Sequence, residues 1–364
     1  MPIKRTFRLS DIDWFLLGLA LAIAGIGVVE IYSTTAHSSL AGQYKKQIVW
    51  ILLCVVLALI VSRIDYHFVI EQVPWLYVLS IILLAGLLGA GRSIAGTKRW
   101  LHVGGLTFQV SEIVKLVIIL VVAAYFADRR SKFVSWGDLA KLGALAAVPA
   151  VLVALEPDLG TALTFFPIVA AGVLVAGIRG RQLVVLCMLG ALALPVGWHF
   201  LRPYQRDRLM TYVNPSQDTQ GTSYQVTQTK IAIGSGGFWG KGIGNGTQSR
   251  LGFIPVSHAD SIFAAFAEEQ GFVGTLIVML LYFALLLRLL DGAQLAADRA
   301  GAFLLVGFAA VLFFQVAINT GMMIGIFPIT GIPLPLMSQG GSSLVFTFLG
   351  LGLAMSVRAR RFVN

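Results

Sequence analysis

The amino-acid sequence predicts an all-α integral membrane protein with about ten transmembrane helices and one long loop outside the membrane, between the seventh and eighth helices. Hydrophobic residues make up 57% of the 364 residues, and charged residues make up only 12%. A soluble globular domain carries about 25% charged residues, so this chain could not cover a surface that faces water. Lipid is therefore its expected solvent.

Ten apolar segments are each about as long as the roughly twenty residues that cross a bilayer as a helix. Only residues 157–160 separate the fifth segment from the sixth, and Pro157 resists continuation of a helix, so a tight turn is expected there. No repeat of fixed period and no low-complexity linker divides the chain, and we expect residues 1–364 to form a single domain. The predicted spans cover residues 14–33, 47–63, 74–91, 110–127, 138–156, 161–178, 182–201, 271–290, 301–319 and 341–357.

Lysine and arginine residues predict how the spans are oriented, because they are enriched in the short loops on the cytoplasmic side. With the N-terminus inside, the inner segments carry most of these residues. The short outer loops carry Lys45, Lys46, Arg92, Lys98 and Arg99. Both termini are therefore expected in the cytoplasm, and the long loop from about residue 202 to residue 270 is expected on the outer side.

The net charge of +10 fits this arrangement. In a soluble domain such an excess of cations would favour nucleic-acid binding. Here the cations lie at the ends of apolar segments, so the anionic head groups of the lipid bilayer are the expected partners and nucleic acid is not. Cys54 and Cys187 both lie within apolar segments, and two unclustered thiols predict neither a disulfide framework nor a metal site.

Charged residues within a membrane span are costly and usually have a partner or a function. Glu112 and Lys115 lie three residues apart in the fourth span, which places them on one face of a helix. Two interpretations remain open: a structural ion pair, or the polar lining of a cavity that admits a charged substrate. At the turn between spans five and six, Asp158 is expected to cap the helix that starts at Thr161.

The outer segment has two features that suggest phosphate chemistry. Arg202, Arg206 and Arg208 form a basic cluster at its start, which could anchor the segment to lipid phosphates or hold a phosphorylated substrate. Residues 233–246 are rich in glycine, but a nucleotide-binding P-loop needs Ser or Thr after its lysine, and Gly242 follows Lys241. No strand is predicted before this segment either, so we exclude a nucleotide site.

His258 and Asp260 lie just before the eighth span, where partial burial would raise the pKa of a carboxyl group toward neutral pH. Asp260 is therefore a candidate general base. A hydrolase triad formed with Ser257 or Ser261 is a weaker alternative, because no nucleophile-elbow pattern surrounds either serine.

Several of these segments together resemble the SEDS family of membrane glycosyltransferases, which is represented by RodA, FtsW and SpoVE. The resemblance covers nearly the whole chain, and ten spans with both ends inside is also the topology of that family. The 246–249 segment, the compact length and the short termini are more similar to RodA, the elongation member, than to FtsW, the division member. The matching segments are 98–100, 109–115, 156–161, 220–225, 230–237, 240–242, 246–249, 253–255, 258–260, 328–335 and 338–343.

The chain departs from the family pattern at a few positions, and the loss of a glutamate at position 256 weakens any role for a second carboxylate in the outer segment. The aspartate that the resemblance marks as essential is retained as Asp260, so activity is still expected. The departures are Val256, Ala259 and Ser261, in a segment that the family commonly reads Leu-Pro-Glu-x-His-Thr-Asp-Phe, Val110 in place of a usual proline, and Gln339 in place of a usual tyrosine.

The resemblance implies a peptidoglycan glycosyltransferase that polymerises lipid II, a disaccharide-pentapeptide on undecaprenyl pyrophosphate, at the outer face of the bacterial cytoplasmic membrane. Asp260 is the expected general base for the attacking sugar hydroxyl. An α-linked donor that gives a β-linked product implies inversion in a single displacement, and positive charge is expected at the leaving pyrophosphate. The expected substrate-binding residues are Lys115, Glu112, Arg99, Arg202, Arg206, Arg208 and His258.

The sequence does not identify a cofactor, and a divalent cation that bridges the pyrophosphate is left open. The resemblance also implies protein partners: a class B penicillin-binding protein, which crosslinks the new strands as a transpeptidase, and the elongation machinery. Two other functions remain open. The chain could be a flippase that moves lipid II outward, which needs alternating access and no base, or a non-catalytic scaffold for the penicillin-binding protein.

Overall fold

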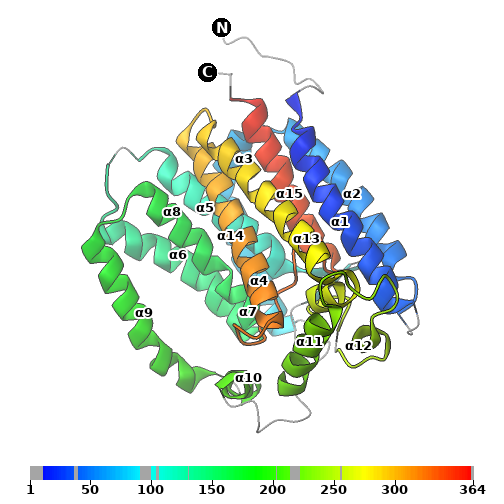
Figure 1. Ribbon diagram of the computed structural model, residues 1–364. Helices are drawn as coiled ribbons and strands as arrows, with labels where there is room; N and C mark the ends of the chain where they lie inside the picture. Colours follow the sequence, from blue (N-terminus) through cyan, green and yellow to red (C-terminus); the bar gives the residue numbers. More distant parts are fainter. Residues whose placement is uncertain are drawn as a thin grey trace.

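The computed structural model describes residues 11–36, 40–90, 100–103, 106–129, 131–201, 203–213, 222–254 and 256–361. Long helices make up most of this part of the chain and run side by side in one bundle (Figure 1). The start of the first helix and the end of the last lie at one end of the bundle. The short helices between residues 203 and 250 lie at the other end (Figure 1).

All ten predicted spans coincide with helices. Nine helices within the described residues are long and apolar enough to cross a membrane, and a tenth apolar helix, Val73–Gly89, is slightly shorter. The spans are α1 (Trp14–Thr35), α2 (Gln43–Arg63), α4 (Val73–Ala90), α5 (Val110–Ala127), α6 (Trp136–Leu155), α7 with α8 (Leu159–Leu163 and Phe165–Ala176), α9 (Gly180–Phe200), α13 (Ile262–Gln294), α14 (Arg299–Met323) and α15 (Gly341–Ala359). The other helices are α3 (Tyr66–Glu71), α10 (Pro203–Val213), α11 (Thr222–Gly236) and α12 (Thr247–Arg250).

The centre of the bundle is formed by α5, α14 and α15, whose side chains are mostly buried. Helix α2 packs against α15, and α14 packs against α5, α8 and α13. The helices approach closely where one of them has a small residue: a Cβ atom on Gly350 would lie 2.2 Å from the ring of Phe308. Helix α9 stands at the edge of the bundle and exposes most of its apolar side chains, as expected for a helix that faces lipid (Figure 1).

A short antiparallel hairpin precedes α5, although no strand was expected from the sequence. Strand β1 (Trp100–Val103) pairs with β2 (Leu106–Gln109), with Trp100 opposite Gln109. Strands of four residues are too short for their alternation of side chains to be recognised in a sequence. The hairpin is important for the site because β2 leads directly into α5.

The predicted outer loop over residues 202–270 is largely helical and shorter than predicted. Helices α10, α11 and α12 account for much of it, and α13 begins at Ile262 rather than near residue 271. Gly271, with φ 64° and ψ −162°, interrupts α13. The prediction began this span after Glu268 and Glu269, because a sequence does not reveal that two adjacent glutamates are buried within a helix.

The glycine-rich segment after α11 folds onto the break in α13. The backbone carbonyls of Glu268 and Glu269 have no helical donor there, and they accept hydrogen bonds from Lys241 N at 3.1 Å and Gly242 N at 2.9 Å. A Cβ atom on Gly240 would lie 2.2 Å from the carbonyl oxygen of Glu269. Glycine is therefore required at this position, because only glycine lets the two backbones approach so closely.

The side chain of Glu268 is fully buried against the same segment. Its carboxylate accepts hydrogen bonds from the Lys241 ammonium group at 2.7 Å, the Thr247 hydroxyl at 2.9 Å and the Gln248 amide at 3.0 Å. A P-loop surrounds a phosphate with a lysine, a hydroxyl and backbone amides in a similar way. Here a glutamate of the chain itself occupies that position, so the glycine-rich segment has a structural role.

Replacing Glu268 with alanine is expected to lower the free energy of unfolding by about 3 kcal/mol, because the Lys241 cation and several buried donors lose their acceptor. Thermal unfolding of the purified protein in detergent micelles measures this loss. Glu71→Ala is the matched control, because Glu71 is exposed on α3. Equal melting temperatures for the two variants would contradict this role of Glu268.

A second polar cluster joins α3 to the start of α14, at the end of the bundle where α1 begins. The ring nitrogens of His67 lie 2.9 Å from Asp65 and 2.6 Å from Asp298. Tyr66 donates a hydrogen bond to Asp298 at 2.9 Å, and Arg360 lies 3.4 Å from Asp65. Burial alone would lower the pKa of His67, but the hydrogen bonds to the two carboxylates outweigh burial and raise this pKa above its ordinary value.

The His67 cluster predicts a contribution to stability that depends on pH. Because the folded state binds the His67 proton more tightly than the unfolded chain, this contribution is fully present below the ordinary histidine pKa of about 6.5. It is lost as the pH rises through the raised pKa of the folded state. We expect the melting temperature of the wild type to fall more than that of His67→Gln as the pH rises from slightly acidic to mildly alkaline. Parallel profiles for the two proteins would show that the cluster does not contribute.

Candidate active site

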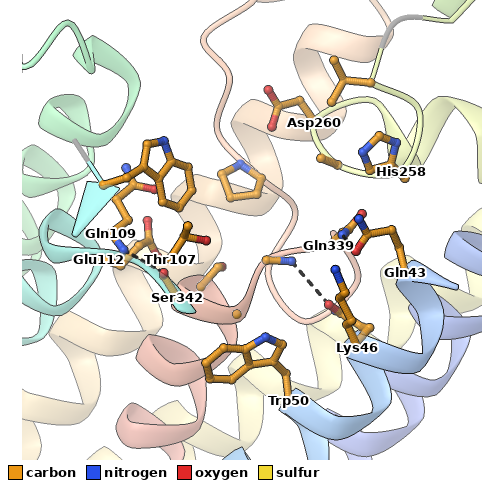
Figure 2. A pocket seen from close by; sticks show the side chains of 18 of the residues that line it. Gln43, Lys46, Trp50, Thr107, Gln109, Glu112, His258, Asp260, Gln339 and Ser342 are labelled. Atoms are coloured by element: carbon orange, nitrogen blue, oxygen red, sulfur yellow. Dashed lines mark hydrogen bonds between the residues drawn. The ribbon is translucent and has the colours of Figure 1, made fainter. Parts of the chain in front are cut away.

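A cavity of about 590 Å³ lies where several helix ends meet. Its wall comes from the start of α2, the β1–β2 hairpin, the start of α5, residues 256–260 and residues 331–343 (Figure 2). The cavity brings together Glu112 and Asp260, which belong to segments far apart in the sequence. Other residues that line it are Lys46, Trp50, Trp100, Gln109, His258 and Gln339.

The segment that carries Asp260 is held by its backbone. Each carbonyl oxygen of three consecutive residues accepts a hydrogen bond from α14 or from the segment before α15. We name this set of bonds the carbonyl clamp. Its bonds run from Gln339 N to His258 O at 3.1 Å, from Ser338 Oγ to Ala259 O at 2.8 Å, and from Asn319 Nδ2 to Asp260 O at 2.9 Å.

Asn319 is the part of the carbonyl clamp that comes from a membrane span. Its side chain is fully buried on α14, and its amide also donates to the carbonyl of Ile332 at 2.8 Å. One side chain therefore joins the Asp260 segment to the segment that leads into α15. Because α14 belongs to the core of the bundle, this bond fixes the Asp260 backbone to a rigid element.

The side chain of Asp260 is half-buried and lines the cavity. It lies beside Gly331, which has a φ of 73°. A Cβ atom on Gly331 would lie 3.5 Å from a carboxylate oxygen of Asp260 and 4.0 Å from a guanidinium nitrogen of Arg208. Gly331 thus leaves space for a carboxylate and a cation to approach the same point.

The predicted pairing of Glu112 with Lys115 is present, with the ammonium nitrogen 2.8 Å from the carboxylate. Lys115 is fully buried and lies over the ring of Phe346, 4.3 Å from its centroid, so it does not reach the cavity. Glu112 does line the cavity, and its second carboxylate oxygen has no hydrogen-bond partner among the described residues. The structural ion pair is thus present, and the binding of a substrate by Glu112 stays a prediction.

The predicted arginine cluster is divided. Arg206 donates hydrogen bonds to the carbonyls of Trp198 and His199 at the end of α9, at 3.1 Å and 2.8 Å, and does not line the cavity. Such a cation satisfies carbonyls that a helix C-terminus leaves without donors. Arg208 approaches Asp260 and also donates to the carbonyl of Ile329 at 3.3 Å. Arg99 and Arg202, two other predicted substrate-binding residues, lie outside the described residues.

His258 lines the cavity beside Asp260 (Figure 2). Burial lowers the pKa of its imidazole below the ordinary value, which favours the neutral ring near neutral pH. A neutral imidazole has one donor and one acceptor nitrogen, and either suits a sugar hydroxyl. Within the described residues, no three histidine, cysteine, aspartate or glutamate side chains lie together as a metal site would require.

The wall formed by α2 was not predicted from the sequence. Gln43, Lys46 and Gln47 line the cavity from the first turns of this helix, together with Gln339. The side-chain amide of Gln339 donates to Gln43 at 2.8 Å. In the sequence, Lys46 indicates only the orientation of the spans, and no local pattern connects it with Asp260.

Comparison with known proteins decides the family. The family model for FtsW, RodA and SpoVE, described as "Cell cycle protein", matches residues 13–362. The peptidoglycan glycosyltransferase MrdB of Escherichia coli K12 is 37% identical over 99% of this chain and 97% of its own length. The peptidoglycan glycosyltransferase RodA of Treponema pallidum is 32% identical over 97% of this chain and 98% of its own length.

The chain belongs to the FtsW/RodA/SpoVE family. A chain from a peptidoglycan synthase complex that coordinates polymerization and crosslinking superimposes with a TM-score of 0.82 at 34% identity, over 97% of this chain and 99% of that one. RodA of Thermus thermophilus, a rod shape determining protein, superimposes with a TM-score of 0.73 at 32% identity, over 97% and 98%. The predicted SEDS membership, the all-α membrane fold and the enzyme class, peptidoglycan glycosyltransferase, are confirmed.

The carbonyl clamp predicts that Asn319 positions Asp260. Replacing Asn319 with leucine removes the donor to the Asp260 carbonyl. For the general base that the sequence predicts at Asp260, a displacement of about 1 Å would cost about 100-fold in rate. We expect kcat for glycan synthesis to fall by about that factor with little change in KM. The matched control is Gln315→Leu, one turn earlier on α14 and also buried. Equal kcat values for the two folded variants would exclude this role.

Proposed function

We propose that this peptidoglycan glycosyltransferase polymerises lipid II, with Asp260 as the general base. The observation that carries the proposal is the cavity, which is lined by Asp260 from one segment and by Glu112 from a membrane span. Its volume is typical of a site for a small ligand or for the head group of a larger one. The relatives named above as peptidoglycan glycosyltransferases support the reaction type.

The proposed reaction is a single displacement at the anomeric carbon of the donor sugar. A hydroxyl group of the acceptor sugar attacks this carbon as its proton passes to the Asp260 carboxylate. The bond from the anomeric carbon to the diphosphate oxygen breaks, and undecaprenyl diphosphate leaves with the electron pair. The configuration of an α-linked donor is thereby inverted to a β-linkage, and one base is sufficient.

Glu112 and His258 are proposed to orient the sugars. The second carboxylate oxygen of Glu112 can accept a hydrogen bond from a sugar hydroxyl, since Lys115 occupies only the first. The half-buried imidazole of His258 can donate or accept one. A divalent cation on the diphosphate stays a prediction: Mg²⁺ commonly binds phosphates with only one or two protein carboxylates, so it needs no dense cluster of ligands.

The location and partners follow from the same proposal. The ends of the described chain lie opposite the α10–α12 region (Figure 1), which supports a topology with both termini in the cytoplasm and this region outside. The bacterial cytoplasmic membrane is the proposed location. The structural neighbour from a complex for polymerization and crosslinking supports a class B penicillin-binding protein as partner. The similarity to RodA, a rod shape determining protein, supports a role in elongation.

Replacing Asp260 with asparagine tests the proposed base. The variant keeps its volume but cannot accept the proton, and loss of a general base typically costs about 10²–10⁴-fold in rate. We expect glycan polymerisation from lipid II to fall by that factor while the protein still purifies as a folded membrane protein. Asp128→Asn, an exposed site at the end of α5, is the control. Polymerisation at the wild-type rate by Asp260→Asn would refute the assignment.

A further inference from the structure

One wall of the cavity contains neither the proposed base nor the residues proposed to orient the sugars. It consists of the first turns of α2, with Gln43, Lys46 and Gln47, and of the N-terminus of α15, with Gln339 before it. Figure 2 shows Lys46 on this wall and Asp260 across the cavity from it. The wall is polar, so a ligand that binds there is expected to be polar or charged.

Lys46 is the one lysine or arginine among the described residues that line the cavity. Two of the other cations expected at the substrate are engaged elsewhere: Lys115 pairs with Glu112, and Arg206 binds the end of α9. A third, Arg208, approaches Asp260 on the opposite side of the cavity. Lys46 is exposed, and no ion pair is recorded for it within the described part of the chain. Its ammonium group is therefore available to an anion that enters the cavity.

The N-terminus of α15 adds hydrogen-bond donors to the same wall. The N-cap residue Gly340 has no side chain that could accept hydrogen bonds from the first turn of the helix. The backbone amides of that turn therefore have no acceptor within α15. Ser342 and Ser343 also line the cavity, and each is more than nine-tenths buried. The partial positive charge of a helix N-terminus favours an anion here as well.

Gln47 joins the two helices that form this wall. Its side-chain amide donates to the carbonyl of Ser338 at 3.1 Å, and its oxygen accepts from Gly340 N at 3.4 Å. Lys46, the neighbour of Gln47 on α2, is thereby held beside the start of α15. These bonds fix the backbone of this wall before a ligand binds.

The direction of the reaction identifies the anion. In a single displacement the attacking hydroxyl and the leaving group lie on opposite sides of the anomeric carbon, so a leaving diphosphate lies across the cavity from the base. We infer that Lys46 and the first turn of α15 bind the diphosphate of the lipid-linked donor. This inference rests on the proposed function. The diphosphate would then lie on a wall that is separate from Asp260. There the Lys46 cation and the helix amides would stabilise the negative charge that develops on the leaving group.

The carboxylates of the peptide stem are a second source of anionic groups on the same substrate. Undecaprenyl diphosphate distinguishes the two sources, because it carries the diphosphate but no sugar and no peptide. Its binding to the full-length protein in detergent micelles can be measured directly, without turnover. Uncharged undecaprenol is the control ligand, since it retains the lipid chain alone.

We expect Lys46→Ala to weaken the binding of undecaprenyl diphosphate by about tenfold or more, as for the loss of a hydrogen bond from a charged group. Lys46→Arg should restore most of the affinity. Lys45→Ala is the matched control, because Lys45 is the neighbouring exposed lysine of α2 but does not line the cavity. Neither this control nor the binding of undecaprenol should change.

Wild-type affinity of Lys46→Ala for undecaprenyl diphosphate would overturn the inference. A loss of affinity for lipid II in the same variant would then assign Lys46 to the peptide stem. A wild-type protein that binds undecaprenyl diphosphate through Lys46 but does not polymerise lipid II would refute the proposed function and leave the diphosphate site standing.

Discussion

The hydrocarbon region of a bilayer offers no hydrogen-bond partners, so charges and interrupted backbone inside a helix bundle need partners within the chain. Lys115 is fully buried, and its ammonium group lies 2.8 Å from a carboxylate oxygen of Glu112 and 4.3 Å from the centroid of the Phe346 ring. The break in α13 meets the same requirement, because the glycine-rich segment takes up the carbonyls that the break leaves free. The same requirement thus accounts for the bonds of the irregular glycine-rich segment.

The active site depends on the same requirement. Residues 256–260 have no regular secondary structure, yet they present the proposed base. The carbonyl clamp satisfies this backbone with donors from α14 and from the segment before α15, two parts of the buried core. The segment is thus tied to rigid elements while the side chain of Asp260 stays half-buried at the cavity. Such an arrangement combines access for a substrate with the fixed geometry that catalysis requires.

The sequence predicts the helices well, because about twenty apolar residues in a chain so poor in charge have few alternatives to spanning a membrane. The Glu112–Lys115 pair and the Asp158 cap are equally predictable, since each joins residues only three positions apart. Contacts between distant segments cannot be predicted in this way. The role of Lys46 in the wall opposite Asp260 depends on how α2 packs against α15, and no spacing in the sequence reveals it. Nor does a cluster of arginines in the sequence reveal which of them donates hydrogen bonds to the last carbonyls of a helix.

The carbonyl clamp also explains why the chain can depart from the family pattern beside its retained aspartate. Ala259 contributes only its carbonyl to the clamp, and Gln339 contributes only its backbone amide, so neither bond depends on the side chain. Ser261 is buried and accepts a hydrogen bond behind the site. Val256 differs, because its φ of 50° is costly for a β-branched residue. Such a conformation persists only where the surrounding structure imposes it, and the clamp that begins two residues later provides that constraint.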